Sequence, residues 1–290
     1  MRIPAIVVGT ERCCQSASWR GRLALPISAA EKVLPISSAT NARRFSRWAS
    51  DSCYVRSVPP DVVIPARITS IDVGAAYRGV RDRVVELTSG LSAEGWEQVV
   101  PHCPNWTVRQ TIAHLSGIVD DALNDNMVGV ATDPWTAAQI AERADTPGPA
   151  IIEEWTTYAP FVDARATELG LSLAQLLFDA VNHEHDLRHA LKSPGRRDSD
   201  ALWVAAHFVS VNINSRFDAN GLEPITLIVD DEALTGRHAI ALHGSVFDVV
   251  RAACSRRSLA QIRSMHWVGD PSAHIDKLFP FTPPPHDIEE

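Results

Sequence analysis

The chain has 290 residues, of which 45% are hydrophobic and 21% are charged, a composition typical of a soluble globular protein. Its net charge of −8 argues against a nucleic-acid partner, because binding to phosphates needs a basic face. No apolar stretch approaches the roughly 20 residues that span a bilayer. The five cysteines are scattered without a C-x-x-C pair, which favours neither a disulfide framework nor a zinc ribbon. We therefore expect a cytoplasmic protein with no membrane association.

Residues 1–66 differ in character from the rest of the chain. They carry nine basic and four acidic residues, lack sustained hydrophobic periodicity, and end in a segment punctuated by prolines. This composition predicts a disordered or weakly ordered N-terminal extension. A basic targeting segment is the alternative, although no clear amphipathic helix supports it.

Residues 67–220 show the pattern of several helices with short connections. Apolar residues at intervals of three and four predict a helix over 70–88. After an expected loop at 102–106, Thr107 and Gln110 form a capping-box pattern that opens the next helix and places His114 beside its apolar stripe. Ser172 and Gln175 repeat that pattern. Further helices are expected over 133–144, 151–169 with a kink at Pro160, 172–192 and 199–217. This succession is typical of an up-and-down bundle.

The hydrophobic period changes after residue 220. A β-branched run at 225–229 and a loosely alternating segment at 238–242 predict two strands. Helices are expected over 246–255 and 258–265. Residues 221–290 therefore predict a small α+β domain that leans on the helical domain.

The segment 178–189 contains three histidines and three acidic residues within a predicted helix. Such groups are costly to bury unless they are paired or bind a metal. Asp179 and His183 are spaced i, i+4 close to the apolar stripe, so they share one face. Glu184, His185, Arg188 and His189 are interpreted as a solvated face.

A carboxylate and an imidazole at this spacing can hold one metal ion, with another ligand from a second helix. His114 is the best candidate, and two imidazoles with one carboxylate leave a coordination position open, as in catalytic zinc sites. The alternatives are a hydrogen-bonded core histidine and an ordinary intrahelical hydrogen bond. His183 and Glu184 begin an H-E-x-x-H motif, but Leu187 breaks it. Cys103 is expected to be buried, and Arg256 and Arg257 are expected at the surface.

Three segments resemble a known family. Residues 103–109 with Ala113-His114-Leu115 resemble the start of the metal-binding domain of mycothiol-dependent maleylpyruvate isomerases, which belong to the DinB/YfiT-like group. Asp179 to Leu191 resembles the second metal motif of that family. Residues 256–263, 267–271 and 279–287 resemble its small C-terminal domain. The resemblance covers about residues 68–290 and leaves the N-terminal extension outside it.

The resemblance implies a mainly α fold, a DinB-like up-and-down four-helix bundle followed by a small α+β C-terminal domain. It implies Zn²⁺, or another divalent metal, on His114, Asp179 and His183, with mycothiol as the thiol cosubstrate. In the family, mycothiol coordinates zinc as a thiolate, adds to a cis double bond, permits rotation and leaves. The best-known isomerase pattern has Glu where this chain has Asp179, whose side chain is one methylene shorter. Arg188 is a candidate contact for a carboxylate of the substrate or thiol.

The leading hypothesis is therefore a mycothiol-dependent isomerase or thiol transferase acting on a small-molecule electrophile. A metal-dependent hydrolase of the DinB-like group, with water in the open position, is one alternative. A non-enzymatic metal-binding or regulatory module that keeps the bundle is the other.

Overall fold

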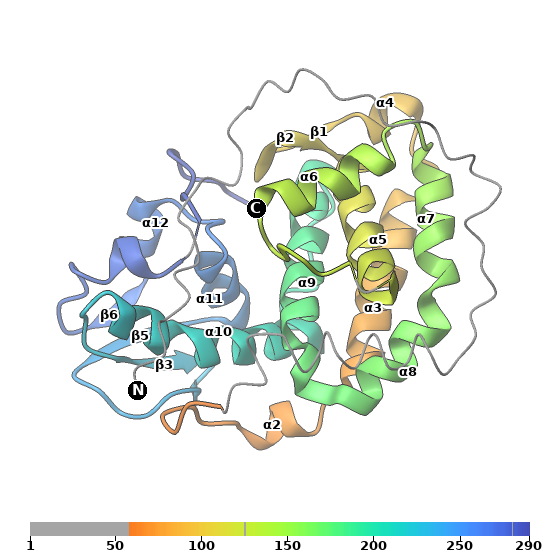
Figure 1. The fold of residues 1–290 in the computed structure, drawn as a ribbon. Helices are drawn as coiled ribbons and strands as arrows, with labels where there is room; N and C mark the ends of the chain where they lie inside the picture. The colour runs from red at the N-terminus through yellow and green to blue at the C-terminus, as the bar shows by residue number, and fades with distance from the viewer. Residues whose placement is uncertain (1–57, 125, 280) are drawn as a thin grey trace.

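The computed structural model describes residues 58–124, 126–279 and 281–290, and within them the chain is mainly helical with a small sheet region, as predicted. Figure 1 shows helices α3 to α9 on one side and the four-stranded sheet with α11 and α12 on the other. The helices are α2 (Ala66–Thr69), α3 (Val73–Thr88), α4 (Ala93–Trp96), α5 (Val108–Asn124), α6 (Asp133–Glu142), α7 (Gly148–Thr157), α8 (Ala159–Leu169), α9 (Ala174–Ala190), α10 (Asp200–Ala219), α11 (Val246–Ala253) and α12 (Leu259–Ser264).

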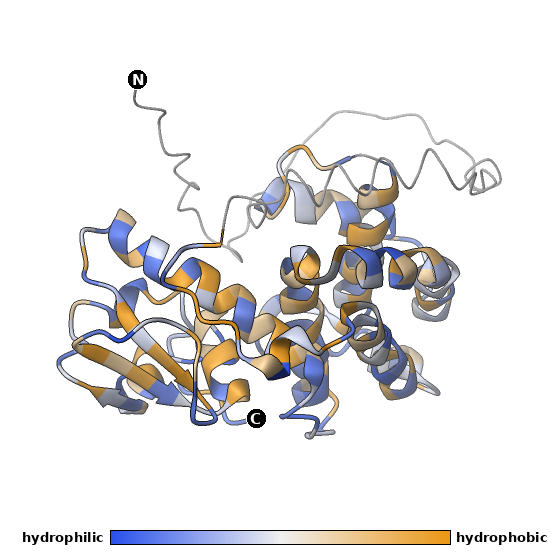
Figure 2. Cartoon of the chain, turned by 90° about the horizontal axis from the view of Figure 1, so that it is seen from below, coloured by the Kyte–Doolittle hydropathy of each residue, from blue (hydrophilic) through white to orange (hydrophobic). Residues whose placement is uncertain are grey.

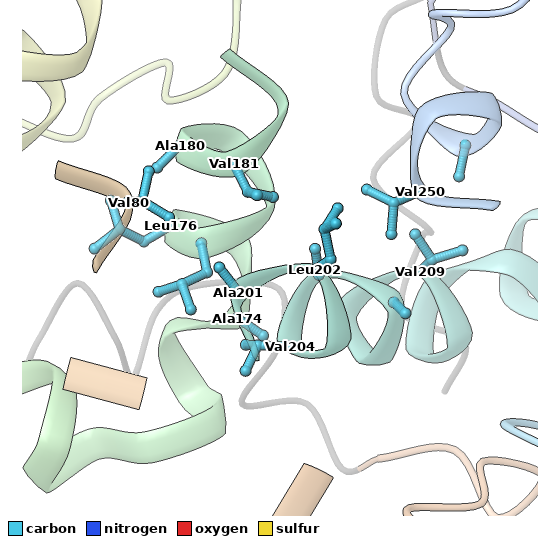
Figure 3. Close-up of a cluster of buried hydrophobic side chains, with 14 of the residues drawn as sticks. Val80, Ala174, Leu176, Ala180, Val181, Ala201, Leu202, Val204, Val209 and Val250 are labelled. Carbon is cyan, nitrogen blue, oxygen red and sulfur yellow. The ribbon is translucent and has the colours of Figure 1, made fainter. Parts of the chain in front are cut away.

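Helix α9 lies at the centre of the molecule. It packs against α3, α5, α10 and α11, and α10 in turn packs against α11. Figure 3 shows Val80 of α3 beside Leu176 and Ala180 of α9, and Val209 of α10 facing Val250 of α11. Burying each large aliphatic side chain in this way contributes about 1.5–3 kcal/mol. The two predicted domains therefore share one continuous core.

The four-stranded sheet has the order β4-β3-β5-β6. Strand β3 (Ile225–Val229) has the predicted bounds, whereas β5 (Ile240–Gly244) begins two residues later than predicted. These two strands are parallel, and the flanking strands β4 (Glu232–Ala233) and β6 (His266–Val268) are antiparallel to them. In Figure 2, hydrophobic residues run along these strands and the helices beside them, while hydrophilic residues predominate in the outer loops.

The expected loop at 102–106 is instead part of a two-stranded hairpin. Strand β1 (Val99–Val100) pairs with β2 (Cys103–Thr107) in antiparallel fashion. At the end of β2 the predicted capping box is present, because Gln110 N donates to Thr107 Oγ1 at 3.3 Å and Thr107 N donates to Gln110 Oε1 at 2.9 Å. The start of α5, and with it the position of His114, is therefore fixed locally.

In contrast to the start of α5, two predicted helix boundaries were wrong. Ser172 does not cap α9, because residues Gly170–Leu173 form a 3-10 turn and the helix begins at Ala174 without a side-chain cap. The single helix expected over 151–169 is two helices, α7 and α8, which meet at Tyr158. Pro160 lies in the first turn of α8, where its missing N–H costs no helical hydrogen bond.

The predicted N-terminal extension lies mostly outside the described residues, since only its residues 58–66 are described. These residues contact the rest of the described chain. Val63 N donates to Leu234 O at 3.0 Å, Asn214 Nδ2 donates to the Asp61 carboxylate at 2.6 Å, and His238 Nε2 lies 2.9 Å from the same carboxylate. The segment is attached to the sheet side of the molecule, which the composition of residues 1–66 did not reveal.

Replacing either of two glycines of α3 by alanine should change the free energy of unfolding in different ways. A Cβ at Gly74 would lie 2.3 Å from Asp163 O on the α8 backbone, whereas a Cβ at Gly79 would meet only the tip of the Arg83 side chain, at 3.1 Å. We expect Gly74→Ala to lower the free energy of unfolding by about 1–3 kcal/mol, as overpacking does. Gly79→Ala should leave it unchanged or raise it by up to about 1 kcal/mol. Urea unfolding of both variants measures this, and equal effects would contradict the close approach of α3 to α8.

Buried His207 on α10 predicts a loss of stability in mild acid. Burial lowers its pKa to about 4, so between pH 6.5 and 4 the unfolded chain binds a proton that the folded chain does not. Stability is thus complete above about pH 6.5 and falls with decreasing pH, by at most about 1.4 kcal/mol per unit from this residue. The pH dependence of the unfolding free energy should be shallower in His207→Gln. An unchanged slope would remove His207 as its source.

Candidate metal centre

His114, Asp179 and His183 come together in the structure. His114 lies on α5, while Asp179 and His183 lie one turn apart on α9. Asp179 Oδ1 is 3.5 Å from His114 Nε2 and 3.7 Å from His183 Nε2, and the three atoms lie within 4.8 Å of one another. Zinc bonds of about 2.0–2.1 Å place neighbouring ligand atoms of a tetrahedral site about 3.4 Å apart. The spacing therefore fits one zinc-sized cation.

A chain of hydrogen bonds orients His114. Gln139 Nε2 donates to Asp121 Oδ2 at 2.7 Å, and Asn126 Nδ2 donates to the other oxygen of that carboxylate at 2.6 Å. The amide nitrogen of Gln139 is thereby directed at Asp121, so its oxygen faces His114 Nδ1, 2.7 Å away. Nδ1 must then carry the hydrogen, which leaves Nε2 as the acceptor that points to Asp179. Metal-ligating histidines are commonly held by such a partner.

His183 is oriented by Asp186, one turn further along α9. His183 Nδ1 lies 3.1 Å from Asp186 Oδ2 as an ion-pair contact, although its N–H is not aligned for a good hydrogen bond. Asp186 is fully buried and accepts from Arg251 Nη2 at 2.6 Å and from Arg256 Nη2 at 2.8 Å. Burial alone would raise the pKa of Asp186, but the two guanidinium groups hold that pKa well below its usual range. Asp186 is therefore ionised at neutral pH.

The Asp179 side chain is 31% exposed, but its carboxylate oxygen Oδ2 is buried without a hydrogen-bond partner among the described residues. Burial alone would raise the pKa of this carboxyl group, but positive charge on the His114 and His183 rings, when they are protonated, lowers it overall. An ionised carboxylate with an unsatisfied oxygen is costly to bury. Together with two imidazole nitrogens directed at the same point, it makes a donor set that fits a divalent cation.

These three side chains lie in the wall of a cavity formed mainly by α5, α6, α9 and the segment that follows α11. The Trp106 ring of β2 lies 5.2 Å from the His114 ring and 5.6 Å from the His183 ring, measured between centroids. The unpredicted hairpin thus places an aromatic wall against both histidines. Sequence reasoning missed Trp106, although it lies inside the segment that carries the family resemblance.

Two cysteines and an arginine also line the cavity. Cys103 is buried, as predicted, and Arg256 Nη2 lies 3.3 Å from its sulfur. Burial raises the pKa of the Cys254 thiol to about 11, so this thiol stays protonated at neutral pH. The prediction that Arg256 and Arg257 form surface charge was wrong, because Arg256 pairs with Asp186 and Arg257 with Glu290. Those partners are distant in sequence.

On the predicted solvated face of α9, Glu184 and His185 are instead buried, and Arg188 and His189 are partly buried. Glu184 is fully buried and accepts two hydrogen bonds from Arg83, at 2.7 and 2.6 Å, and one from Arg188 at 2.9 Å. The His185 ring packs edge-on against Phe247 of α11, with centroids 4.8 Å apart, and burial lowers the pKa of His185 to about 3. Helix α11 covers this face, and the period of α9 alone could not show that.

Arg188, the candidate substrate or thiol contact, lines a second cavity and not the one beside the proposed ligands. Its guanidinium bonds Glu184 and the carbonyl oxygen of Ser193. His189 Nδ1 lies 3.1 Å from His102 Nε2, which in turn lies 3.1 Å from Glu290 Oε2. These three groups also have metal-ligand spacing, but Glu290 is already neutralised by Arg251 and Arg257.

One comparison, with known protein families, agrees with the sequence resemblance. A family model described as the mycothiol maleylpyruvate isomerase N-terminal domain matches residues 77–188, a span that includes His114, Asp179 and His183. This match supports the family resemblance over these residues. Searches of curated proteins and of solved structures found no match. Among the described residues, no helix has the length and apolar character needed to cross a membrane.

The orientation of His114 by Gln139 predicts a specific effect on metal affinity. Gln139→Leu removes the acceptor for His114 Nδ1 and should weaken zinc binding about 10- to 100-fold, as loss of an outer hydrogen-bond partner does. Gln175→Leu is the matched control, because Gln175 lines the same cavity but has no hydrogen bond to the proposed ligands. Competition with a fluorescent zinc chelator measures both affinities. Equal affinities in the two variants would contradict this role for Gln139.

Proposed function

We propose that this protein is a mycothiol-dependent enzyme that binds zinc, or another divalent metal, through His114, Asp179 and His183. The reaction is addition or transfer of the thiol to a small electrophile, with isomerisation as one form of it. The observation that supports this most directly is the convergence of two histidine Nε2 atoms and one carboxylate oxygen on a cavity wall, inside the matched domain. We further propose the DinB-like four-helix arrangement for residues 67–220 and a cytoplasmic location.

A divalent metal at this position would act as a Lewis acid that lowers the pKa of a thiol or water. The other contributions come from the chain. Gln139 holds the His114 ring in orientation, and Asp186 lies 3.1 Å from His183 Nδ1. Trp106 covers both rings on one side. Arg256 lies in the cavity wall, where its guanidinium group pairs with Asp186 and lies 3.3 Å from the Cys103 sulfur.

Asp179 bears on the strength of the metal site. Its shorter side chain keeps the carboxylate close to the axis of α9, and yet Oδ1 reaches within 3.5–3.7 Å of both imidazole nitrogens. The replacement of Glu by Asp is therefore compatible with a complete set of three ligands. We propose that these three residues, which line the cavity, would together hold the metal.

Metal analysis of the full chain tests the first part of the proposal. We expect about one zinc per chain after purification without chelator, and less than a tenth of that in His114→Ala and His183→Ala. His286→Ala is the matched control, because His286 is exposed and lies outside the site, and it should retain the metal. Wild-type protein that takes up no divalent metal when dialysed against zinc would contradict the proposal.

Calorimetry with mycothiol tests the second part. Zinc-loaded protein should bind the thiol with a dissociation constant below about 1 mM, and binding should be lost in His183→Ala. Binding of zinc without any binding of mycothiol at millimolar concentration would favour the metal-dependent hydrolase. The non-enzymatic module is favoured instead if the wild-type protein binds zinc and Asp179→Ala changes only the stability of the protein.

A further inference from the structure

The wall of the cavity beside the proposed metal ligands is largely apolar. Large hydrophobic side chains reach it from α5, α6, α9 and the loop between α5 and α6, as well as from the C-terminal segment: Ile118, Met127, Val130, Trp135, Leu176, Phe178 and Phe281. Ligand cavities of this kind bind mainly by removing apolar surface from water, and a few polar groups set the orientation. The apolar character of the wall therefore indicates which kind of substrate the cavity can bind.

Few charges are available to hold an anionic substrate. Apart from the proposed ligands, the charged residues in the described wall are Asp133 and Arg256. Arg256 already shares its charge with Asp186, through contacts of 2.8 and 3.3 Å, and Asp133 repels anions. The charge of a bound divalent cation would be offset by Asp179 and by a thiolate. A substrate with two negative charges would thus be desolvated without matching positive charges, which is costly.

The mouth of the cavity is apolar as well. Met127 and Val130 line the cavity, and Val128 between them is 91% exposed. Val130 and Phe281 are also exposed at the wall, at 40% and 36%. Ala131, in the same loop, has φ of 62°, a conformation that is uncommon for a residue other than glycine. Exposed apolar groups gathered at a cavity mouth are typical of a ligand-binding site.

We infer that this cavity takes an apolar electrophile that carries at most one negative charge, and that it discriminates against small dicarboxylates. The electrophilic nature of the ligand rests on the function proposed above. Its apolar and weakly charged character rests on the residues of the cavity wall alone. The occupant places its hydrocarbon portion between the α5–α6 loop and Phe281. Its reactive end then faces His114, Asp179 and His183.

Calorimetry of the full chain with matched carboxylates tests this inference, in zinc-loaded and chelator-treated protein. Octanoate should bind at least tenfold more tightly than suberate, the dicarboxylate of equal length, and more tightly than hexanoate by about threefold or fourfold per methylene. Uncharged 1-octanol should bind within about tenfold of octanoate. Suberate binding as tightly as octanoate, or no gain in affinity with chain length, would overturn the inference.

A variant at the mouth locates the binding. Val130→Asp should weaken octanoate binding at least fivefold, whereas Val58→Asp, at a similarly exposed valine that does not line the cavity, should leave it unchanged. Equal effects of both variants would place the ligand elsewhere. If zinc and mycothiol bind but octanoate does not, this inference fails alone. If octanoate binds and zinc does not, the proposed function fails while the apolar cavity stands.

Discussion

The buried carboxylate of Asp186 connects the proposed metal centre to the C-terminal part of the chain. It lies on α9, one turn from His183, and receives hydrogen bonds from Arg251 of α11 and from Arg256 just beyond it. Removing such charges from water costs several kcal/mol per ion, and leaving one partner unpaired costs about 3–5 kcal/mol. The orientation of His183 therefore depends on the correct docking of α11. The proposed ligands lie in the domain matched by the family model, but part of their support comes from Arg251 and Arg256, outside that domain.

The same principle explains the unusual composition of α9. A helix that packs on several sides has no face left for solvent, so each of its charged residues needs a partner from another element. Glu184 finds Arg83 of α3, and Asp186 finds the arginines near α11. The high density of acids and histidines in this central helix therefore reflects the number of neighbouring elements that supply partners for them. Among the acidic residues of α9, which is described in full, Asp179 alone keeps a buried oxygen without a hydrogen-bond partner.

Local signals in the sequence predicted the features that depend on neighbouring residues. Hydrophobic period placed most helices, the Thr107–Gln110 box fixed the start of α5, and the i, i+4 spacing with the family resemblance brought together His114, Asp179 and His183. The features that depend on distant contacts were missed. Gln139 reaches His114 across 25 positions and Arg256 reaches Asp186 across 70. The exposure of α9 was mispredicted because its period carries no information about a helix some 60 residues further on.

The attachment of residues 58–65 has a consequence for the order in which the chain folds. Asp61 bonds Gly236 and His238, residues that lie 175 and 177 positions away. Contacts of such long range pay the entropy of closing a large loop before they gain any energy, so they form late. During synthesis these contacts of Asp61 cannot form until the first strands of the sheet have left the ribosome. In the folded protein few residues hold the segment 58–65 in place, so local unfolding should begin with its detachment.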